Sequence, residues 1–157
     1  MTGFGQILED LNGAGVRYVL IGGIALIRHG VVRATRDVDA VFDPDPANLD
    51  RIRSLAAKWD ATLPDGSPIP EGGISADRSI DLRTAHGELD LVSEKIAAVP
   101  FQDLLARAET RRVDGVEAPI CSLPDLVAMK RAVGRERDLV DLADLEAAHG
   151  SLPDRGK

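Results

Sequence analysis

Apolar residues recur along the chain at two spacings, one typical of helices and the other of strands. Between residues 4 and 11 they recur every three or four positions, which predicts an amphipathic helix. Residues 18–21 form an uninterrupted apolar run of β-forming residues, which predicts a strand buried on both faces. Gly22 and Gly23 end this run, and a short helix is predicted to follow it.

The same two spacings divide the remainder of the chain into further elements. Helices are predicted over residues 24–29, 47–59, 101–108, 123–133 and 136–148. Strands are predicted over residues 37–42, 79–84, 88–92, 110–113 and 116–120, and a loop rich in proline and glycine over 64–73. This order predicts an α/β (α+β) fold, in which helices flank a short mixed β-sheet and a helical pair closes the C-terminal end.

The length of 157 residues is that of one domain, which we expect to span residues 1–157. Within it, residues 1–120 are predicted to form the mixed core and residues 121–150 the closing helices. A lone cysteine, Cys121, excludes an internal disulfide and is expected to be a buried thiol. With no signal peptide and no long apolar run, we expect a cytoplasmic protein without a membrane partner.

The net charge of −7 argues against general nucleic-acid binding, which usually needs a basic surface. The charge is uneven, however. The segment from Arg17 to Arg36 holds four arginines and no acid, and carboxylates resume at Asp37. A basic segment that leads into acidic residues suits a complex of a metal ion with a triphosphate, although a solvated surface is the simpler alternative.

Three aspartates are candidate metal ligands and catalytic residues. Asp37 and Asp39 lie two apart on a predicted strand, so they share a face with Cα atoms about 6.5–7 Å apart. Carboxylates so placed can hold Mg²⁺, or Mn²⁺, which bind oxygen ligands. Two-metal phosphoryl chemistry needs a third carboxylate on the acceptor side. Asp90 on the strand 88–92 can supply it, and Asp81 is its competitor.

Gly22 and Gly23 follow a buried strand and open a helix, which lets a phosphate approach free backbone N–H groups. A double glycine alone is weak evidence because tight turns use it often, and an Asp-x-Asp pair alone is weak too. Their order is more specific: strand, Gly-Gly, helix, Thr-Arg, and then Asp-x-Asp on a strand.

The segments 22–25 and 33–39 together resemble the signature of the polymerase-β-like nucleotidyltransferase superfamily. The Gly-Gly form is closer to antibiotic nucleotidyltransferases and abortive-infection-type toxins than to minimal antitoxin nucleotidyltransferases, which usually carry Gly-Ser. Residues 84–91 are similar to the strand of the third carboxylate, which favours Asp90 over Asp81. Residues 122–141 resemble the closing helical motif of small bacterial members, and the resemblance spans about residues 15–148.

This resemblance implies the fold of the superfamily and a set of nucleotide-binding residues. They are Gly22, Gly23, Thr35, Arg36, Lys130, Arg135 and Asp138. Lys130 would contact the triphosphate, and Asp138 would support the site. The alternative for the last three residues is an exposed network of helical charge pairs.

The resulting hypothesis is a metal-dependent transfer of a nucleoside monophosphate from an NTP to a hydroxyl acceptor. The acceptor is RNA such as tRNA, a protein or a small molecule, and an antitoxin or a second copy is a candidate partner in a toxin–antitoxin system. RNA would need the basic residues of two segments, which are Arg28, Arg33, Arg36, Lys130, Arg131, Arg135 and Arg137. The alternative is a catalytically silent binding module, against which the three carboxylates argue. A dinucleotide-binding oxidoreductase is excluded because no Gly-x-Gly-x-x-Gly follows the first strand.

Overall fold

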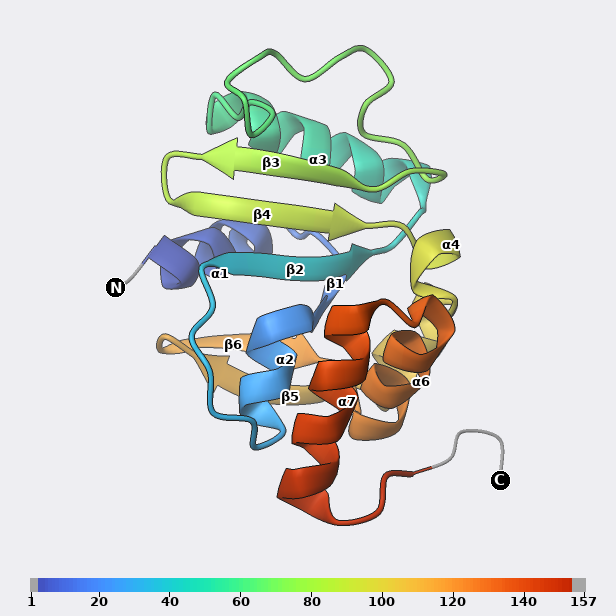
Figure 1. The fold of residues 1–157 in the computed structure, drawn as a ribbon. Coiled ribbons are helices and arrows are strands. Elements are labelled where there is room, and N and C mark those ends of the chain that lie inside the picture. The colour runs from blue at the N-terminus through green and yellow to red at the C-terminus, as the bar shows by residue number, and fades with distance from the viewer. Residues whose placement is uncertain (1–2, 154–157) are drawn as a thin grey trace.

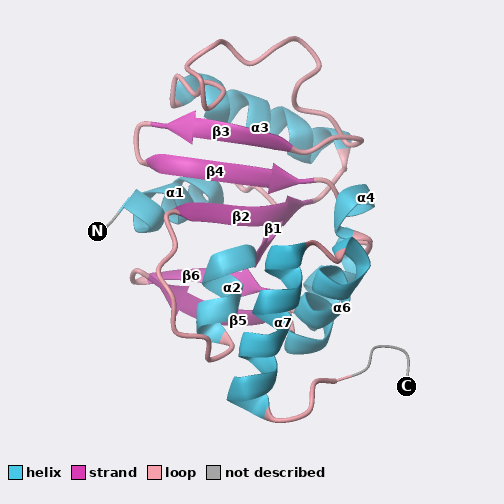
Figure 2. Cartoon of the chain, viewed as in Figure 1, coloured by secondary structure: helices cyan, strands magenta, loops and turns pink. Residues whose placement is uncertain are grey.

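A six-stranded mixed sheet organises the chain in the computed structural model, which describes residues 3–153 (Figures 1 and 2). The ends of the range predicted as one domain, residues 1–2 and 154–157, lie outside the described residues. The strands are β1 (Tyr18–Ile21), β2 (Asp37–Phe42), β3 (Ile80–Thr84), β4 (Gly87–Val92), β5 (Glu109–Val113) and β6 (Val116–Ile120), in the spatial order β3-β4-β2-β1-β6-β5.

Seven helices of the described chain surround this sheet. They are α1 (Gly3–Gly13), α2 (Gly22–Arg28), α3 (Pro46–Lys58), α4 (Glu94–Ala97), α5 (Phe101–Arg107), α6 (Leu123–Val133) and α7 (Glu136–His149). The short helix α4 was not predicted, because one turn shows no periodicity. It forms because the Ser93 side chain accepts a hydrogen bond from the Lys95 N–H at its start.

The pairing of the strands confirms the predicted fold class, a mixed sheet with helices packed on it and a helical pair at the C-terminal end. The pairs β1–β2, β3–β4 and β5–β6 are antiparallel, whereas β2–β4 and β1–β6 are parallel. The parallel pair β2–β4 is the one that matters for the candidate site, because it places two strands that carry aspartates side by side.

The two faces of the sheet differ in their cover. In β2, the side chains of Val38, Ala40 and Phe42 are buried, and those of Asp37 and Asp39 alternate with them. The helices α1 and α3 lie behind the sheet in Figure 1, and α2 and α7 lie in front of it. The aspartates are therefore on the face that carries α2 and α7, and the apolar residues hold the sheet against the opposite layer.

The core is mainly aliphatic, and its buried apolar residues form one cluster. Trp59 belongs to it and donates from its indole nitrogen to Asp10, at 2.7 Å, which links the end of α3 to α1. Cys121 is fully buried, and burial raises the pKa of its thiol to about 12, as expected for a structural cysteine.

A buried amide fixes β1 against β2, and the sequence pattern did not reveal it. The Asn48 side chain accepts a hydrogen bond from the Arg17 N–H, at 2.7 Å, and donates to the Arg17 carbonyl, at 3.1 Å. It also donates to the Asp43 carbonyl, at 2.9 Å. Since Arg17 precedes β1 and Asp43 follows β2, this one side chain holds the two strands together at one end.

The segment between α3 and β3 contains the predicted loop 64–73. Thr62, just before this loop, pairs its backbone with Arg83 of β3, which covers part of that edge of the sheet. No helix in the described part of the chain is long and apolar enough to cross a membrane.

Candidate active site

Three carboxylates form a row across the sheet. Asp39 of β2 lies in register with Asp90 of β4, and Asp90 lies in register with Asp81 of β3. Residues in register on neighbouring strands share a face. Asp37, two positions before Asp39 on the same strand, shares this face too. The structure therefore brings the three predicted aspartates together and adds Asp81 at the outer end of the row.

A second row of charges lies beside the first. Asp37 is in register with Glu88 of β4, and Glu88 is in register with Arg83 of β3. Glu88 was not predicted as part of the site, because its place beside Asp37 depends on the register of two strands far apart in sequence. The side chains of Asp81 and Arg83 are exposed, whereas Asp37, Asp39, Glu88 and Asp90 are partly buried.

The carboxyl group of Asp39 is destabilised as an anion. Burial raises its pKa most, and the nearby charge of Asp37 raises it further. A hydrogen bond with Asp90, a second from the Gly23 N–H and the charge of Lys130 lower the pKa in part, but the net shift is upward. The backbone at the start of α2 and a lysine of α6 thus both act on this carboxyl group.

The pKa of Asp90 is also raised. Burial is the largest cause, followed by the hydrogen bond with Asp39, the charge of Asp39 and then that of Asp81. Two carboxyl groups that hydrogen-bond to each other share a proton, so the pair carries less than two negative charges in the metal-free protein. A divalent cation would replace this proton and allow both groups to ionise.

The chemistry of this donor set fits a hard divalent cation, because its side chains offer carboxylate oxygens. Among residues 3–153, however, no group of three or more His, Cys, Asp or Glu side chains is arranged to hold a metal ion by itself. A cation at this place therefore needs further oxygen ligands. In magnesium sites, water and substrate phosphates commonly supply them.

Gly22 and Gly23 lie directly against the residues of the site. Gly22 has a φ of +66°, and a Cβ atom there would come within 2.8 Å of the Asp39 Cβ. A Cβ atom on Gly23 would lie 2.6 Å from the Thr35 hydroxyl oxygen. Glycine is required at both positions because α2 starts in contact with β2 and with the segment before it.

Thr35 and Arg36 have different environments. The Thr35 hydroxyl donates to the Asp37 carbonyl, at 3.3 Å, so it supports the backbone at the start of β2. Arg36 lines a hollow together with residues of α1 and the turn at His86. Since side chains alternate along an extended segment, Arg36 points away from the face that carries Asp37. The structure brings Thr35 to the site but not Arg36.

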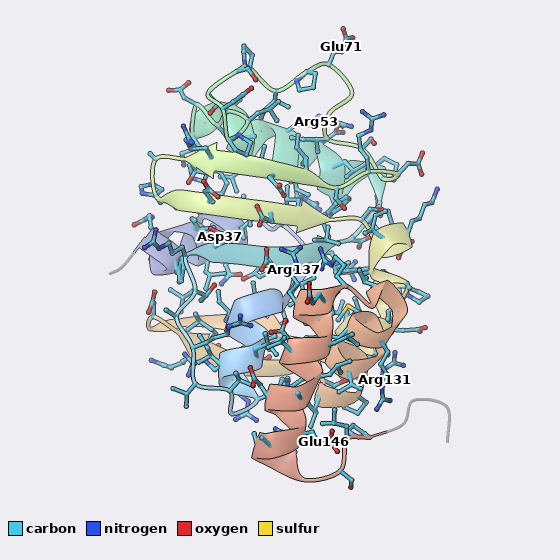
Figure 3. All side chains as sticks on the ribbon, in the orientation of Figure 1. Asp37, Arg53, Glu71, Arg131, Arg137 and Glu146 are labelled. Atoms are coloured by element: carbon cyan, nitrogen blue, oxygen red, sulfur yellow. The ribbon has the colours of Figure 1, made fainter. Side chains whose placement is uncertain are left out.

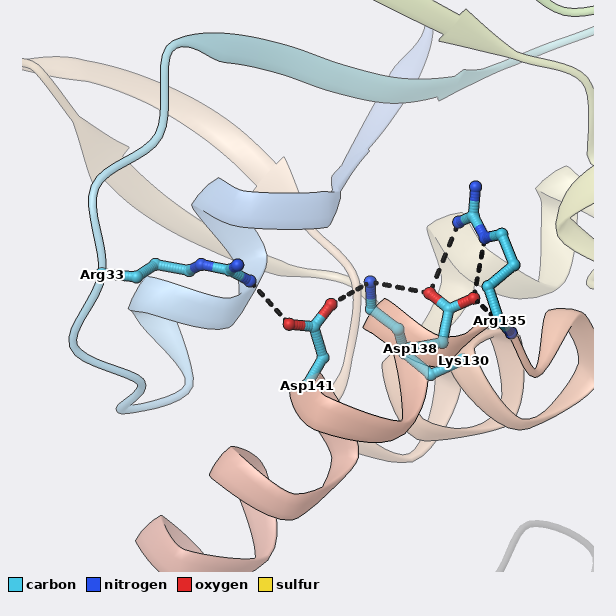
Figure 4. Close-up of polar contacts among 5 residues, drawn as sticks. All are labelled: Arg33, Lys130, Arg135, Asp138 and Asp141. Atoms are coloured by element: carbon cyan, nitrogen blue, oxygen red, sulfur yellow. Dashed lines mark hydrogen bonds and ion pairs between the residues drawn. The ribbon is translucent and has the colours of Figure 1, made fainter.

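Five charged residues form a network between α7 and its neighbours (Figure 4). The members of this ion-pair network are Arg33, Lys130, Arg135, Asp138 and Asp141. The Lys130 amino group lies 2.8 Å from an Asp141 oxygen and 3.4 Å from an Asp138 oxygen. Arg33 lies 2.7 Å from the other Asp141 oxygen. Asp141 was not predicted as a site residue.

Asp138 holds the turn between α6 and α7. It accepts hydrogen bonds from the Arg135 backbone N–H, at 3.0 Å, and from the Arg135 guanidinium, at 2.8 Å. Burial alone would raise the pKa of Asp138, but these hydrogen bonds and the Lys130 charge outweigh it and lower the pKa. Because Asp138 and Asp141 are buried, the network differs from the exposed helical network that was the alternative.

The basic residues of the two predicted segments do not all meet. Arg131 of α6 donates to the Pro153 carbonyl and lies beside the C-terminal segment, far from Asp37 (Figure 3). Arg33 and Lys130 meet at Asp141, on the side of the sheet that carries the aspartates. The basic surface near the carboxylates is therefore smaller than the sequence suggested.

Comparison with known proteins identifies one matching family and several solved structures with a similar fold. A model of the family described as nucleotidyltransferase of unknown function (DUF6036) matches residues 5–149. An antigenic nucleotidyltransferase-like protein from Paracoccidioides brasiliensis has a similar structure, with a TM-score of 0.60 and 19% identity over 92% of this chain and 72% of that one. No curated protein matches the chain.

Two solved structures of antibiotic-modifying proteins are similar as well. The lincosamide antibiotic adenylyltransferase LnuA, bound to lincomycin, has a TM-score of 0.59 and 15% identity over 93% of this chain and 96% of that one. ANT(2")-Ia in complex with adenylyl-2"-tobramycin has a TM-score of 0.60 and 11% identity over 92% of this chain and 86% of that one. At these identities the likeness shows the fold.

Replacing Gly22 by alanine tests the close contact between α2 and β2. Gly22→Ala should lower the free energy of unfolding by about 2–4 kcal/mol, because the positive φ and the approach to Asp39 both oppose a side chain. Urea denaturation measures this change. The control is Gly13→Ala at the end of α1, where nothing lies within 4 Å of the added atom and stability should stay within about 1 kcal/mol. Equal losses in both variants would contradict this role for Gly22.

The raised pKa of Asp90 predicts how stability depends on pH without metal. The folded protein binds the Asp90 proton more tightly than the unfolded chain does. Stability from this group is therefore greatest below the ordinary carboxyl pKa, about 4, and is lost as pH rises through the raised pKa. Asp90→Asn removes this loss, and it should be about 1–2 kcal/mol more stable than wild type at pH 8 after allowance for the half-exposed site.

Chemical denaturation of both proteins with a chelator, at pH values from 4 to 8, measures the difference. The two should be similar in stability at pH 4 and should diverge as the pH rises. A difference in stability between the two proteins that is the same at pH 4 and pH 8 would show that the pKa of Asp90 is not raised in the folded protein.

Proposed function

Because the chain belongs to this family of nucleotidyltransferases, we propose that Asp37, Asp39 and Asp90 form the metal-dependent catalytic site of an NTP-dependent enzyme. The resemblance to polymerase-β-like nucleotidyltransferases is confirmed by this membership and by the similar folds. The observation that carries the proposal is the register of β2 and β4, which pairs Asp39 with Asp90 directly beside the start of α2.

Each carboxylate has a place in the proposed reaction. Asp37 and Asp39 would hold Mg²⁺ or Mn²⁺ together with the triphosphate, and Asp90 would serve the acceptor side. When bound, such a cation neutralises charge that develops on the phosphate oxygens. Asp90 would be ionised once the cation is bound, and its carboxylate could then accept a proton from an acceptor hydroxyl.

The triphosphate would lie between the start of α2 and the ion-pair network. The Gly23 N–H and the Lys130 charge both act on Asp39, so a triphosphate bound beside Asp39 would meet both groups. The acceptor oxygen attacks the α-phosphorus, and the bond from that phosphorus to the oxygen bridging to the β-phosphate breaks. Pyrophosphate leaves, and the hydroxyl proton passes to Asp90. Catalysis by this route is mainly positioning and charge neutralisation.

The acceptor is proposed to be a small molecule or a protein hydroxyl. The acceptor side of the row carries Asp81 and Glu88 in addition to Asp90, with Arg83 as the neighbouring cation. Such a surface repels the phosphates of RNA, and the net charge of −7 adds to this repulsion. LnuA and ANT(2")-Ia are solved with small antibiotic molecules, which agrees with an acceptor of this size.

Nucleotide binding tests the metal site. Asp37→Asn combined with Asp39→Asn should weaken binding of Mg·NTP at least about tenfold, because both proposed metal ligands lose their charge. Calorimetry with each of the four nucleotides in Mg²⁺ measures the affinity. The control is Asp50→Asn on α3, where the carboxylate is exposed and pairs with Arg53 away from the site. Unchanged affinity in the double variant would reject the site, and binding without any label transfer to RNA, protein or small-molecule fractions would favour the silent binding module.

A further inference from the structure

Arg33 connects the segment before β2 to the closing helix α7. It lies on the connection between α2 and β2 and reaches towards α7, where its guanidinium lies 2.7 Å from Asp141 (Figure 4). The Arg33 side chain is 39% exposed, whereas the Asp141 side chain is only 7% exposed. One end of this ion pair is thus accessible to water, and the other is fixed within the protein.

Asp141 is shared between two cations, one on each of its oxygens. Arg33 binds the first oxygen, and the Lys130 amino group lies 2.8 Å from the second. A carboxylate held at both oxygens cannot rotate without losing one partner, so Arg33 fixes the oxygen that Lys130 meets. Lys130 comes from α6, and its side chain is only 14% exposed.

We propose that Arg33 is a positioning residue, which acts through Asp141 to hold the Lys130 amino group where the triphosphate binds. The inference rests on the proposed function in so far as Lys130 contacts the triphosphate. A lysine side chain loses rotational freedom when it binds a phosphate, and a side chain that is already held loses less. Arg33 therefore strengthens nucleotide binding without touching the nucleotide.

A purely structural ion pair is the competing explanation, and the chain contains a matched control for it. Arg107 pairs with Asp125 of α6 through two bonds of 2.9 Å. Its side chain is 44% exposed and that of Asp125 is 1% exposed, so this pair also joins an accessible arginine to a buried aspartate. No contact of this pair in the described structure involves Lys130 or the aspartate row.

Nucleotide affinity separates the two explanations. Arg33→Gln should weaken Mg·NTP binding about three- to fivefold, and Arg33→Lys should restore part of it. Arg33→Gln and Arg107→Gln should lower the urea midpoint of unfolding by similar amounts. Only Arg33→Gln should also weaken nucleotide binding, and Arg107→Gln should leave nucleotide affinity unchanged. Equal loss of affinity in Arg33→Gln and Arg107→Gln would overturn the proposal, because it would show an effect of stability alone.

The path through Asp141 is tested in a double variant. Asp141→Asn keeps the shape of the side chain and removes its charge, so Arg33 has no anion to orient. Adding Arg33→Gln to Asp141→Asn should then cause no further loss of nucleotide affinity. Losses that multiply would show that Arg33 binds the nucleotide directly, and they would overturn the indirect role.

A measurement without nucleotide keeps this inference separate from the proposed function. The reactivity of Lys130 with an amine-directed reagent, measured by mass spectrometry, should rise severalfold in Arg33→Gln but not in Arg107→Gln. Unchanged labelling of Lys130 in Arg33→Gln overturns the positioning role. Increased labelling in a protein whose wild type binds no NTP supports the link through Asp141 and rejects the proposed function alone.

Discussion

Repulsion between Asp39 and Asp90 is the constraint on which the rest of the site depends. The parallel pairing of β2 and β4 holds these carboxyl groups in register, partly shielded from water, where two full charges are unfavourable. The protein offsets this cost with a shared proton, with the Gly23 N–H and with the charge of Lys130. Each of these groups comes from a different element, so the site needs α2, α6 and two strands at once.

The opposite face of the sheet stabilises this arrangement. The buried side chains of β2, among them Val38 and Ala40, pack in the apolar core while the aspartates face the other way. Asn48 ties the end of β2 to the start of β1 with three hydrogen bonds. The strands therefore keep their register even where their other face carries charges that repel. Binding of a divalent cation would relieve the repulsion between these carboxylates, and this relief would strengthen cation binding.

Local patterns predicted the elements well, and long-range pairings were beyond them. The strand and helix ranges followed from periodicity and from glycine and proline positions, and α4 was too short to show either. The spacing of Asp37 and Asp39 predicted that their side chains share a face. The position of Glu88 beside Asp37 depends on the register of β2 and β4, which the spacing does not give. Asp141 between Arg33 and Lys130 depends on how α7 packs. For Arg36 the alternation of side chains along an extended segment already implied the face opposite to Asp37, and the resemblance to the superfamily hid this.

The carboxylate row is proposed to have a nucleotide side and an acceptor side, with Asp90 acting on the acceptor side. Transfer of label from an α-phosphate-labelled NTP to acceptor fractions tests it most directly, with Asp90→Ala compared against Asp81→Ala. Asp90→Ala should abolish transfer, by about a hundredfold or more, while much of the nucleotide affinity remains, and Asp81→Ala should retain most of the transfer. Loss of transfer in Asp81→Ala alone, or equal loss in both variants, would show that Asp90 is not the carboxylate that acts on the acceptor.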